Sequence, residues 1–104
     1  MEMTALTRQD KMIVFLSGEI DHHSVKDIRD DIDKIMIESK PKALILNLTG
    51  IGFMDSSGLG LILGRYRRAS ELGIQLYISG ADKNVLKILK MAGVDKLIKT
   101  IPTE

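Results

Sequence analysis

The order of apolar and polar residues along this chain predicts strands separated by helices. Residues 12–16 form a short apolar run that ends at Ser17-Gly18, which is typical of a buried strand. Residues 3–6 predict a strand before it, and a turn at Gln9-Asp10 would make this first pair antiparallel. Residues 43–48 form the strongest apolar run, as expected of a central strand that is covered on both faces.

Helical spacing of the apolar residues predicts three helices. The first follows Ser24, which is a suitable N-cap, and ends near Ser39, just before Pro41. The second runs from about Ser57 to Leu72, and the third is short. The predicted apolar faces comprise Val25, Ile28, Ile32, Ile35 and Met36, then Leu59, Ile62, Leu63, Tyr66 and Ala69, and finally Val85, Ile88, Leu89 and Ala92.

The remaining segments complete an α/β fold. Residues 49–55 are expected to form a loop, and residues 74–78 and 97–101 two further strands. The order is therefore β-β-α-β-α-β-α-β, and its strand–helix–strand repeats imply right-handed crossovers and a largely parallel sheet. We predict a single domain over residues 1–104, with a mixed, mostly parallel sheet of four or five strands and helices packed on it.

Composition and charge exclude several classes of protein. The 15 basic and 14 acidic side chains are balanced, whereas a nucleic-acid-binding surface needs an excess of basic residues. The apolar stretches are far shorter than the ~20 residues of a membrane-spanning helix, and the first residues do not resemble a signal peptide. The absence of cysteine excludes disulfides and thiolate metal sites. We expect a cytoplasmic protein with no membrane or nucleic-acid partner.

The segment with the clearest chemical potential is residues 53–60, Phe-Met-Asp-Ser-Ser-Gly-Leu-Gly, between a central strand and a helix. Sites in open α/β sheets lie beyond the carboxyl ends of strands, where a helix N-terminus offers free N–H groups. The glycine spacing differs by one residue from that of a dinucleotide-binding loop. A serine nucleophile needs a glycine two residues before it, which Ser56 lacks, and nothing places His22 or His23 beside it as a base.

Two interpretations of this segment remain open from the residues alone. In the first, Asp55 or Ser56 caps the helix, and the glycines allow the helix to pack closely on the sheet. In the second, a kinase phosphorylates a serine at the exposed start of the helix, which adds about −1.5 to −2 charges. The helix dipole tolerates that charge, and no basic residue within residues 49–64 would neutralise it. The effect of a phosphate should therefore fall on a partner surface.

A second polar cluster occupies residues 18–24, Gly-Glu-Ile-Asp-His-His-Ser, between a strand and the first helix. Adjacent histidines on a helix cannot face one ion, and their spacing matches no zinc motif, so we expect no metal. If the crossovers are regular, this cluster and residues 55–60 lie on the same side of the sheet and form one composite surface. Arg65, Arg67 and Arg68 predict a solvated helix face at the rim of that surface.

These two segments resemble the anti-sigma-factor antagonist family, whose domain is called the STAS domain. The resemblance rests on residues 17–23, 46–48 and 53–60, the last running into residues 62–66, and it covers about residues 3 to 101. The Asp-Ser-Ser-Gly-Leu-Gly block is specific to this family, and the Gly-Glu-x-Asp-His-His block narrows the similarity toward its sporulation branch. Family members often continue into a C-terminal helix, whereas this sequence stops at Glu104.

The resemblance implies the STAS fold and a regulatory function without catalysis. A partner anti-sigma factor that is itself a serine kinase would phosphorylate Ser56 with ATP that the kinase binds, so no cofactor is expected in this chain. The unphosphorylated form would bind the kinase and release its sigma factor, of the sporulation sigma F type. A PP2C-type phosphatase would reset the phosphorylated form. The residues expected to contact the partner are Asp21, Asp55, Ser56, Ser57, Gly58, Leu59, Gly60 and Arg65.

Other functions make different predictions. Within the same family, the chain could be an interaction module for a partner without kinase activity, as in stressosomes. A small hydrolase or a nucleotide binder would instead show turnover or ligand binding without any partner. Only the resemblance, and not the chemistry of the residues, distinguishes Ser56 from Ser57 as the phosphoacceptor. We expect the free protein to be a monomer.

Overall fold

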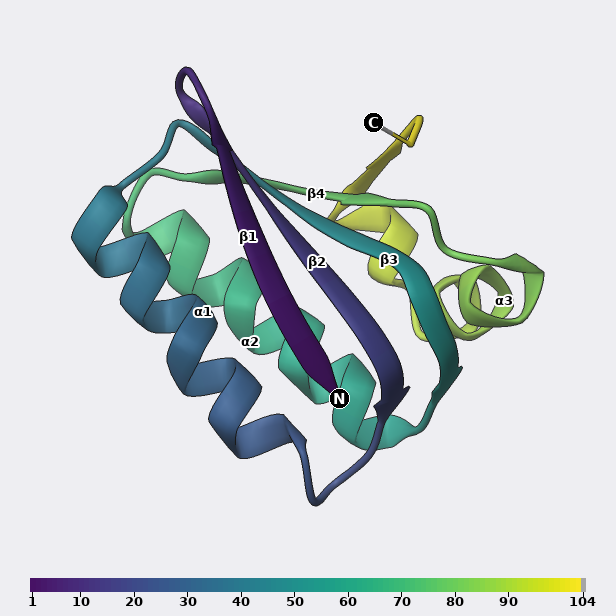
Figure 1. The fold of residues 1–104 in the computed structure, drawn as a ribbon. Coiled ribbons are helices and arrows are strands. Elements are labelled where there is room, and N and C mark those ends of the chain that lie inside the picture. The colour runs from purple at the N-terminus through teal and green to yellow at the C-terminus, as the bar shows by residue number, and fades with distance from the viewer. Residues whose placement is uncertain (104) are drawn as a thin grey trace.

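The computed structural model describes residues 1–103 and shows a five-stranded mixed sheet with two long helices, α1 and α2, behind it (Figure 1). The strands follow the order β1-β2-β3-β4-β5, in which β1 is antiparallel to β2 and the other pairs are parallel. The predicted fold class and order of elements are confirmed. The elements are β1 (Glu2–Arg8), β2 (Lys11–Ile20), α1 (Val25–Ser39), β3 (Ala43–Met54), α2 (Ser56–Glu71), β4 (Gln75–Ser79), α3 (Lys83–Met91), the 3-10 helix η1 (Val94–Lys96) and β5 (Lys99–Ile101).

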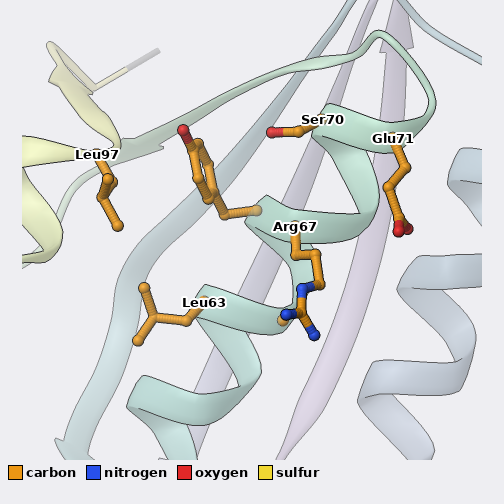
Figure 2. Close-up of a pocket in the computed structure, with 7 residues that line it drawn as sticks. Leu63, Arg67, Ser70, Glu71 and Leu97 are labelled. Carbon is orange, nitrogen blue, oxygen red and sulfur yellow. The ribbon is translucent and has the colours of Figure 1, made fainter.

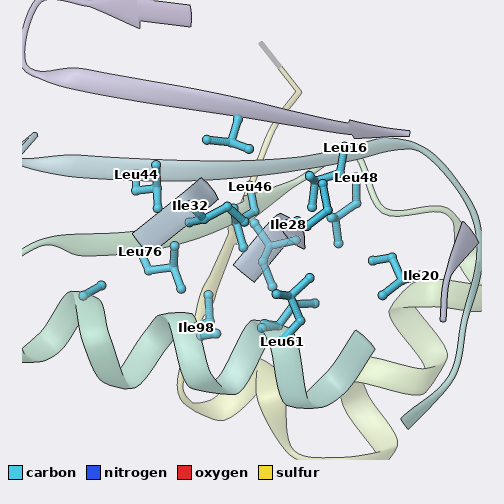
Figure 3. Packing of buried hydrophobic residues seen from close by; sticks show 14 of the residues in the cluster. Leu16, Ile20, Ile28, Ile32, Leu44, Leu46, Leu48, Leu61, Leu76 and Ile98 are labelled. Carbon is cyan, nitrogen blue, oxygen red and sulfur yellow. The ribbon is translucent and has the colours of Figure 1, made fainter. Parts of the chain in front are cut away.

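The core lies between the sheet and the helices (Figure 3). Alternate residues of each strand point to the helix side, because successive side chains in a strand face opposite ways. From α1, the predicted residues Ile28, Ile32 and Met36 are buried against them. The strand residues in this core include Met12, Val14 and Leu16 of β2, Leu44, Leu46 and Leu48 of β3, and Leu76 and Ile78 of β4.

The central strands β2 and β3 are longer than predicted. Residues 49–54 belong to β3 and not to a loop, and β2 continues to Ile20. The two extensions pair with each other, with register shifts between Phe15 and Ser17 and between Gly18 and Glu19. Such bulges interrupt the regular alternation of side chains, so the sequence pattern did not reveal the extended pairing.

The buried face of α2 is rotated relative to the prediction. Ile62 and Ala69 are buried as predicted, but Leu61 and Arg65 join them in place of Leu59, Leu63 and Tyr66, which are half-buried. The sequence contained this ambiguity, since α2 carries apolar residues on more than one side. In the described part of the chain, no helix combines the length and the apolar character needed to cross a bilayer.

The last predicted strand is shorter than expected. The 3-10 helix η1 occupies residues 94–96, Leu97 is exposed, and β5 begins only at Lys99. Ile98 is buried in the core, so a local apolar pattern was present here without a strand. In α3, Val85 and Leu89 are buried as predicted, whereas Ala92 lies after the helix and is exposed.

Candidate functional site

The ends of β2 and β3 bring the two polar segments of the sequence together. Ile20 pairs with Met54 in parallel register, and the N–H of Asp55 donates a hydrogen bond to the C=O of Ile20 at 3.3 Å. Asp21 and Asp55 therefore leave the sheet from neighbouring positions. The predicted composite surface of residues 18–24 and 55–60 is confirmed, and we call it the strand-end surface.

Asp55 fixes the start of α2. Its backbone is extended, and its carboxylate accepts a hydrogen bond from the N–H of Ser57 at 2.8 Å, which satisfies one of the free donors of the first turn. Of the two candidate caps, Asp55 is therefore the cap, and Ser56 is the first helical residue. Ser56 is exposed, whereas Ser57 is half-buried. The structure thus distinguishes by their exposure two serines that residue chemistry alone could not distinguish.

Asp21 organises the turn that leads into α1. Its Oδ1 accepts hydrogen bonds from the N–H of His23 at 3.0 Å and from the N–H and the hydroxyl of Ser24 at 3.1 Å each. The backbone hydrogen bond from Ser24, followed by its hydroxyl bond, lowers the pKa of Asp21. Ser24 is the N-cap residue of α1 as predicted, but its hydroxyl binds Asp21 and makes no cap hydrogen bond.

A groove of about 370 Å³ lies between the first turns of α1 and α2. It brings Lys26 and Arg29 of α1 beside Ser57 and Gly60 of α2. The absence of basic residues from residues 49–64 therefore does not leave the surface without positive charge. The sequence pattern did not reveal these two residues, because their place beside Ser57 depends on how the helices pack. The lining residues are His22, Val25, Lys26, Arg29, Ser57, Gly60 and Leu61.

Phe53 adds an apolar feature to the strand-end surface. It is the penultimate residue of β3, pairs with Glu19 and keeps 51% of its surface exposed. Exposed aromatic side chains are enriched at sites that bind other proteins. The sequence signal was available, since an aromatic residue stood beside the candidate serines, but the assumed loop gave no orientation for it.

The prediction that Arg65 lies on a solvated rim of this surface is wrong, whereas its contact with a partner stays a prediction. It is only 7% exposed, and its Nε lies 2.9 Å from Oδ1 of Asp33 on α1. Burial lowers the pKa of Arg65, and the Asp33 carboxylate opposes this shift. Arg65 therefore joins α1 to α2 beneath the surface. Arg67 and Arg68 are exposed as predicted.

The other predicted contact residues divide by burial. Gly58 is buried, and a side chain there would meet Met54 and Ile20, so its function is to let α2 begin close to the sheet. Leu59 is half-buried against the core, and Gly60 is exposed. Among residues 1–103, no cluster of three or more histidine and acidic side chains could hold a metal ion.

A larger groove lies on the other side of α2, away from the strand-end surface. Figure 2 shows Leu63, Arg67, Ser70 and Glu71 on one wall and Leu97 on the other. Its volume is about 570 Å³. It contains none of the residues that the sequence singled out as partner contacts, so size alone does not locate the functional site.

Comparison with known proteins gives these features a context. An anti-sigma F factor antagonist of Paenibacillus polymyxa is 36% identical over 93 residues, which cover 89% of this chain and 80% of that protein. An anti-sigma F factor antagonist of Lysinibacillus sphaericus is 32% identical over 89 residues, covering 86% of this chain and 76% of that protein.

Solved structures show the same fold. The anti-sigma factor antagonist SpoIIAA in its unphosphorylated form superposes with a TM-score of 0.84 at 26% identity, covering 99% of this chain and 89% of that one. The phosphorylated form of the Bacillus cell fate determinant SpoIIAA gives a TM-score of 0.77 at 25% identity, with 99% and 92% covered. The sequence profile of the STAS domain matches residues 2–104. This chain belongs to the STAS domain family.

Proposed function

We propose that this chain is an anti-sigma factor antagonist of the sporulation sigma F type, switched by phosphorylation of Ser56. The observation that carries the proposal is the exposure of Ser56 at the first position of α2, next to the cap residue Asp55 of the strand-end surface. The relatives named anti-sigma F factor antagonist, and the existence of SpoIIAA in an unphosphorylated and a phosphorylated form, support it. In this proposal the protein is regulatory, cytoplasmic and not an enzyme.

The phosphate would come from the partner. An anti-sigma factor with serine kinase activity binds ATP, and the Ser56 hydroxyl oxygen attacks the γ-phosphorus. The new O–P bond forms as the bond to ADP breaks, and the hydroxyl proton passes to a base of the kinase. A PP2C-type phosphatase then hydrolyses the phosphoserine and restores the hydroxyl. This chain needs no cofactor of its own in either step.

The switch acts through the charge of the strand-end surface. A neutral Ser56 can be covered by a partner, whereas a phosphate there would lose its water. Lys26 and Arg29 line the groove beside Ser57 and Gly60, and Ser56 is not among its lining residues. Asp21 and Asp55 lie in the same surface and are acidic as well. Phe53 offers the partner an apolar anchor. The start of α2 tolerates an anion, so we propose that partner binding is lost while the fold is kept.

The proposal is tested by incubating the protein with its cognate anti-sigma kinase and ATP, followed by intact mass and peptide mapping. We expect a single phosphate on Ser56, none in Ser56→Ala, and normal labelling in the matched control Ser57→Ala. If a kinase that is active on other substrates leaves the protein unlabelled, the phosphorylation switch is wrong. The chain is then an interaction module of the STAS family for a partner without kinase activity.

A further inference from the structure

The strand β1 forms an open edge of the sheet. It pairs with β2 on one side, no strand within residues 1–103 lies on the other, and its residues 4–8 are exposed (Figure 1). Edge strands are usually protected by being short or by charged or proline residues within them. The opposite edge, β5, has only three residues and is followed by Pro102. In β1, the five residues between Glu2 and Arg8 carry neither a charge nor a proline.

The hairpin register defines which backbone groups of β1 face outward. Arg8 pairs with Lys11 across the two-residue turn Gln9-Asp10. A pair that closes such a turn exchanges its hydrogen bonds, and in an antiparallel ladder this recurs at every second residue. Even-numbered residues of β1 therefore bond to β2, and odd-numbered residues direct N–H and C=O groups to the open edge. These outward residues are Met3, Ala5 and Thr7.

The side chains of β1 are complementary to a second copy of the same strand. In an antiparallel pair centred on Ala5, the outward backbone groups of Met3, Ala5 and Thr7 meet those of Thr7, Ala5 and Met3 of the partner subunit. The same register places Glu2 opposite Arg8 of the partner subunit and Thr4 opposite Leu6 of the partner subunit. Within residues 1–103, neither Glu2 nor Arg8 forms an ion pair.

We propose that two copies of this chain associate through antiparallel pairing of their β1 strands about Ala5. The pairing would join the two five-stranded sheets, form two Glu2–Arg8 ion pairs and cover Leu6, which is 43% exposed in one copy. One register satisfies the backbone groups and the charges together. This proposal replaces the expectation of a free monomer with a monomer that dimerises as its concentration rises.

The open edge of β1 does not include Ser56, the proposed phosphorylation site in the strand-end surface. Ser56 lies beyond the end of β3, which is separated from β1 by the whole of β2. Both Ser56 residues therefore stay accessible in the dimer. Since two short strands bury less area than the ~1,200 Å² of a small stable interface, the association is expected to be weak and reversible. Loss of dimerisation would leave phosphorylation of Ser56 intact, so the two proposals fail separately.

Sedimentation equilibrium over a wide range of protein concentrations tests the proposal. We expect the mass to rise from 11.6 kDa toward twice that value. Arg8→Glu places two acidic residues opposite each other at both ends of the paired strands and should weaken association by about tenfold or more. The exchange Glu2→Arg with Arg8→Glu restores both ion pairs and should bring association back close to the original strength.

A backbone variant provides the second test. Ala5→Pro removes an N–H that faces the open edge and leaves the hydrogen bonds to β2, so the monomer should fold and dimerisation should be lost. Circular dichroism and thermal unfolding check the fold of this variant, and the charge variants decide the question if it fails to fold. A wild-type protein that stays monomeric at every concentration would overturn the proposal, as would an Arg8→Glu variant that associates like the wild type.

Discussion

At the scale of single residues, Asp21 and Asp55 play the same structural role at the ends of the neighbouring strands β2 and β3. Each carboxylate accepts N–H groups of the turn that begins the next helix, Asp21 before α1 and Asp55 before α2. These bonds hold two acidic side chains at the ends of the neighbouring strands β2 and β3, just before the Ser56 that begins α2. The electrostatic character of the surface therefore depends on capping interactions as well as on composition.

We predict that Asp21 stays ionised below its ordinary pKa of 3.8, because the N–H and the hydroxyl of Ser24 bind the carboxylate and lower that pKa. The stabilisation that this turn contributes is complete above pH 3.8 and is lost as the pH falls through the lowered pKa. A titration followed by the carboxyl carbon resonance measures the midpoint. In Ser24→Ala, which keeps the backbone donor and removes the hydroxyl, the midpoint should rise part of the way; a wild-type midpoint at or above 3.8 would show that the turn is not formed in solution.

Gly58 and Gly60 provide a matched pair of substitutions in the first turns of α2. A Cβ at Gly58 would meet Met54 and come within 2.9 Å of Ile20 Cγ2, whereas nothing lies within 4 Å at Gly60. Overpacking costs about 1–3 kcal/mol, and alanine gains about 1 kcal/mol over glycine in a helix. We expect Gly58→Ala to lower the free energy of unfolding in urea and Gly60→Ala to raise it by up to about 1 kcal/mol. Equal stabilisation by both would refute the close packing of α2 on the sheet.

The sequence predicted which residues form this site better than it predicted their exposure. The adjacent serines are chemically equivalent, and only the cap at Asp55 leaves Ser56 exposed and Ser57 half-buried. Arg65 was expected at the surface because arginine is rarely buried without a partner. Its partner, Asp33, is remote in the sequence, so no local pattern could show the pair.

At the scale of elements, α1 and α2 are joined beneath the strand-end surface by the Arg65–Asp33 ion pair. The two side chains are only 9% and 18% exposed. By contrast, the pair of Arg68 and Glu71 within α2 is exposed and longer, at 3.9 Å. The buried pair thus connects α1 and α2, the two helices that line the groove with Lys26 and Arg29.

Removing one member of this buried pair should be costly. Arg65→Ala leaves the Asp33 carboxylate without its counter-charge, and we expect a loss of about 3 kcal/mol in the free energy of unfolding. Replacing both residues, as in Arg65→Met with Asp33→Leu, should recover part of that loss. Arg68→Ala is the control, with an expected change below about 0.5 kcal/mol. Equal losses for Arg65→Ala and Arg68→Ala in urea denaturation would show that the buried pair contributes no more to the free energy of unfolding than the exposed pair.

The order and type of the elements could be predicted because each has its own period of apolar residues. The prediction was less accurate where that period is interrupted. The bulges interrupt the alternation of side chains, so the sequence pattern did not predict the extension of β2 and β3. The glycines and polar residues of the segment 49–54 are typical of a loop, although the segment pairs as part of a strand. In α2, apolar residues on several sides left the buried face ambiguous.

At the scale of the whole molecule, the fold determines where the proposed switch can act. Right-handed crossovers place the carboxyl ends of the parallel strands together, so the general position of the site followed from the predicted topology. The place of Lys26 and Arg29 beside Ser57 could not be predicted in this way, since it depends on the packing of α1 against α2. In the proposed function, phosphorylation therefore changes the charge of the strand-end surface without a change of fold.

The most direct test of this account compares binding of the unphosphorylated and the Ser56-phosphorylated protein to the anti-sigma factor by calorimetry, with amide spectra of both free forms. We predict that phosphorylation weakens binding by at least about thirtyfold, because an unpaired buried charge at an interface costs about 2–5 kcal/mol. The amide shifts should change only around the strand-end surface. Equal affinity of the two forms, or shifts spread through the sheet and helices, would contradict a surface-charge switch at Ser56.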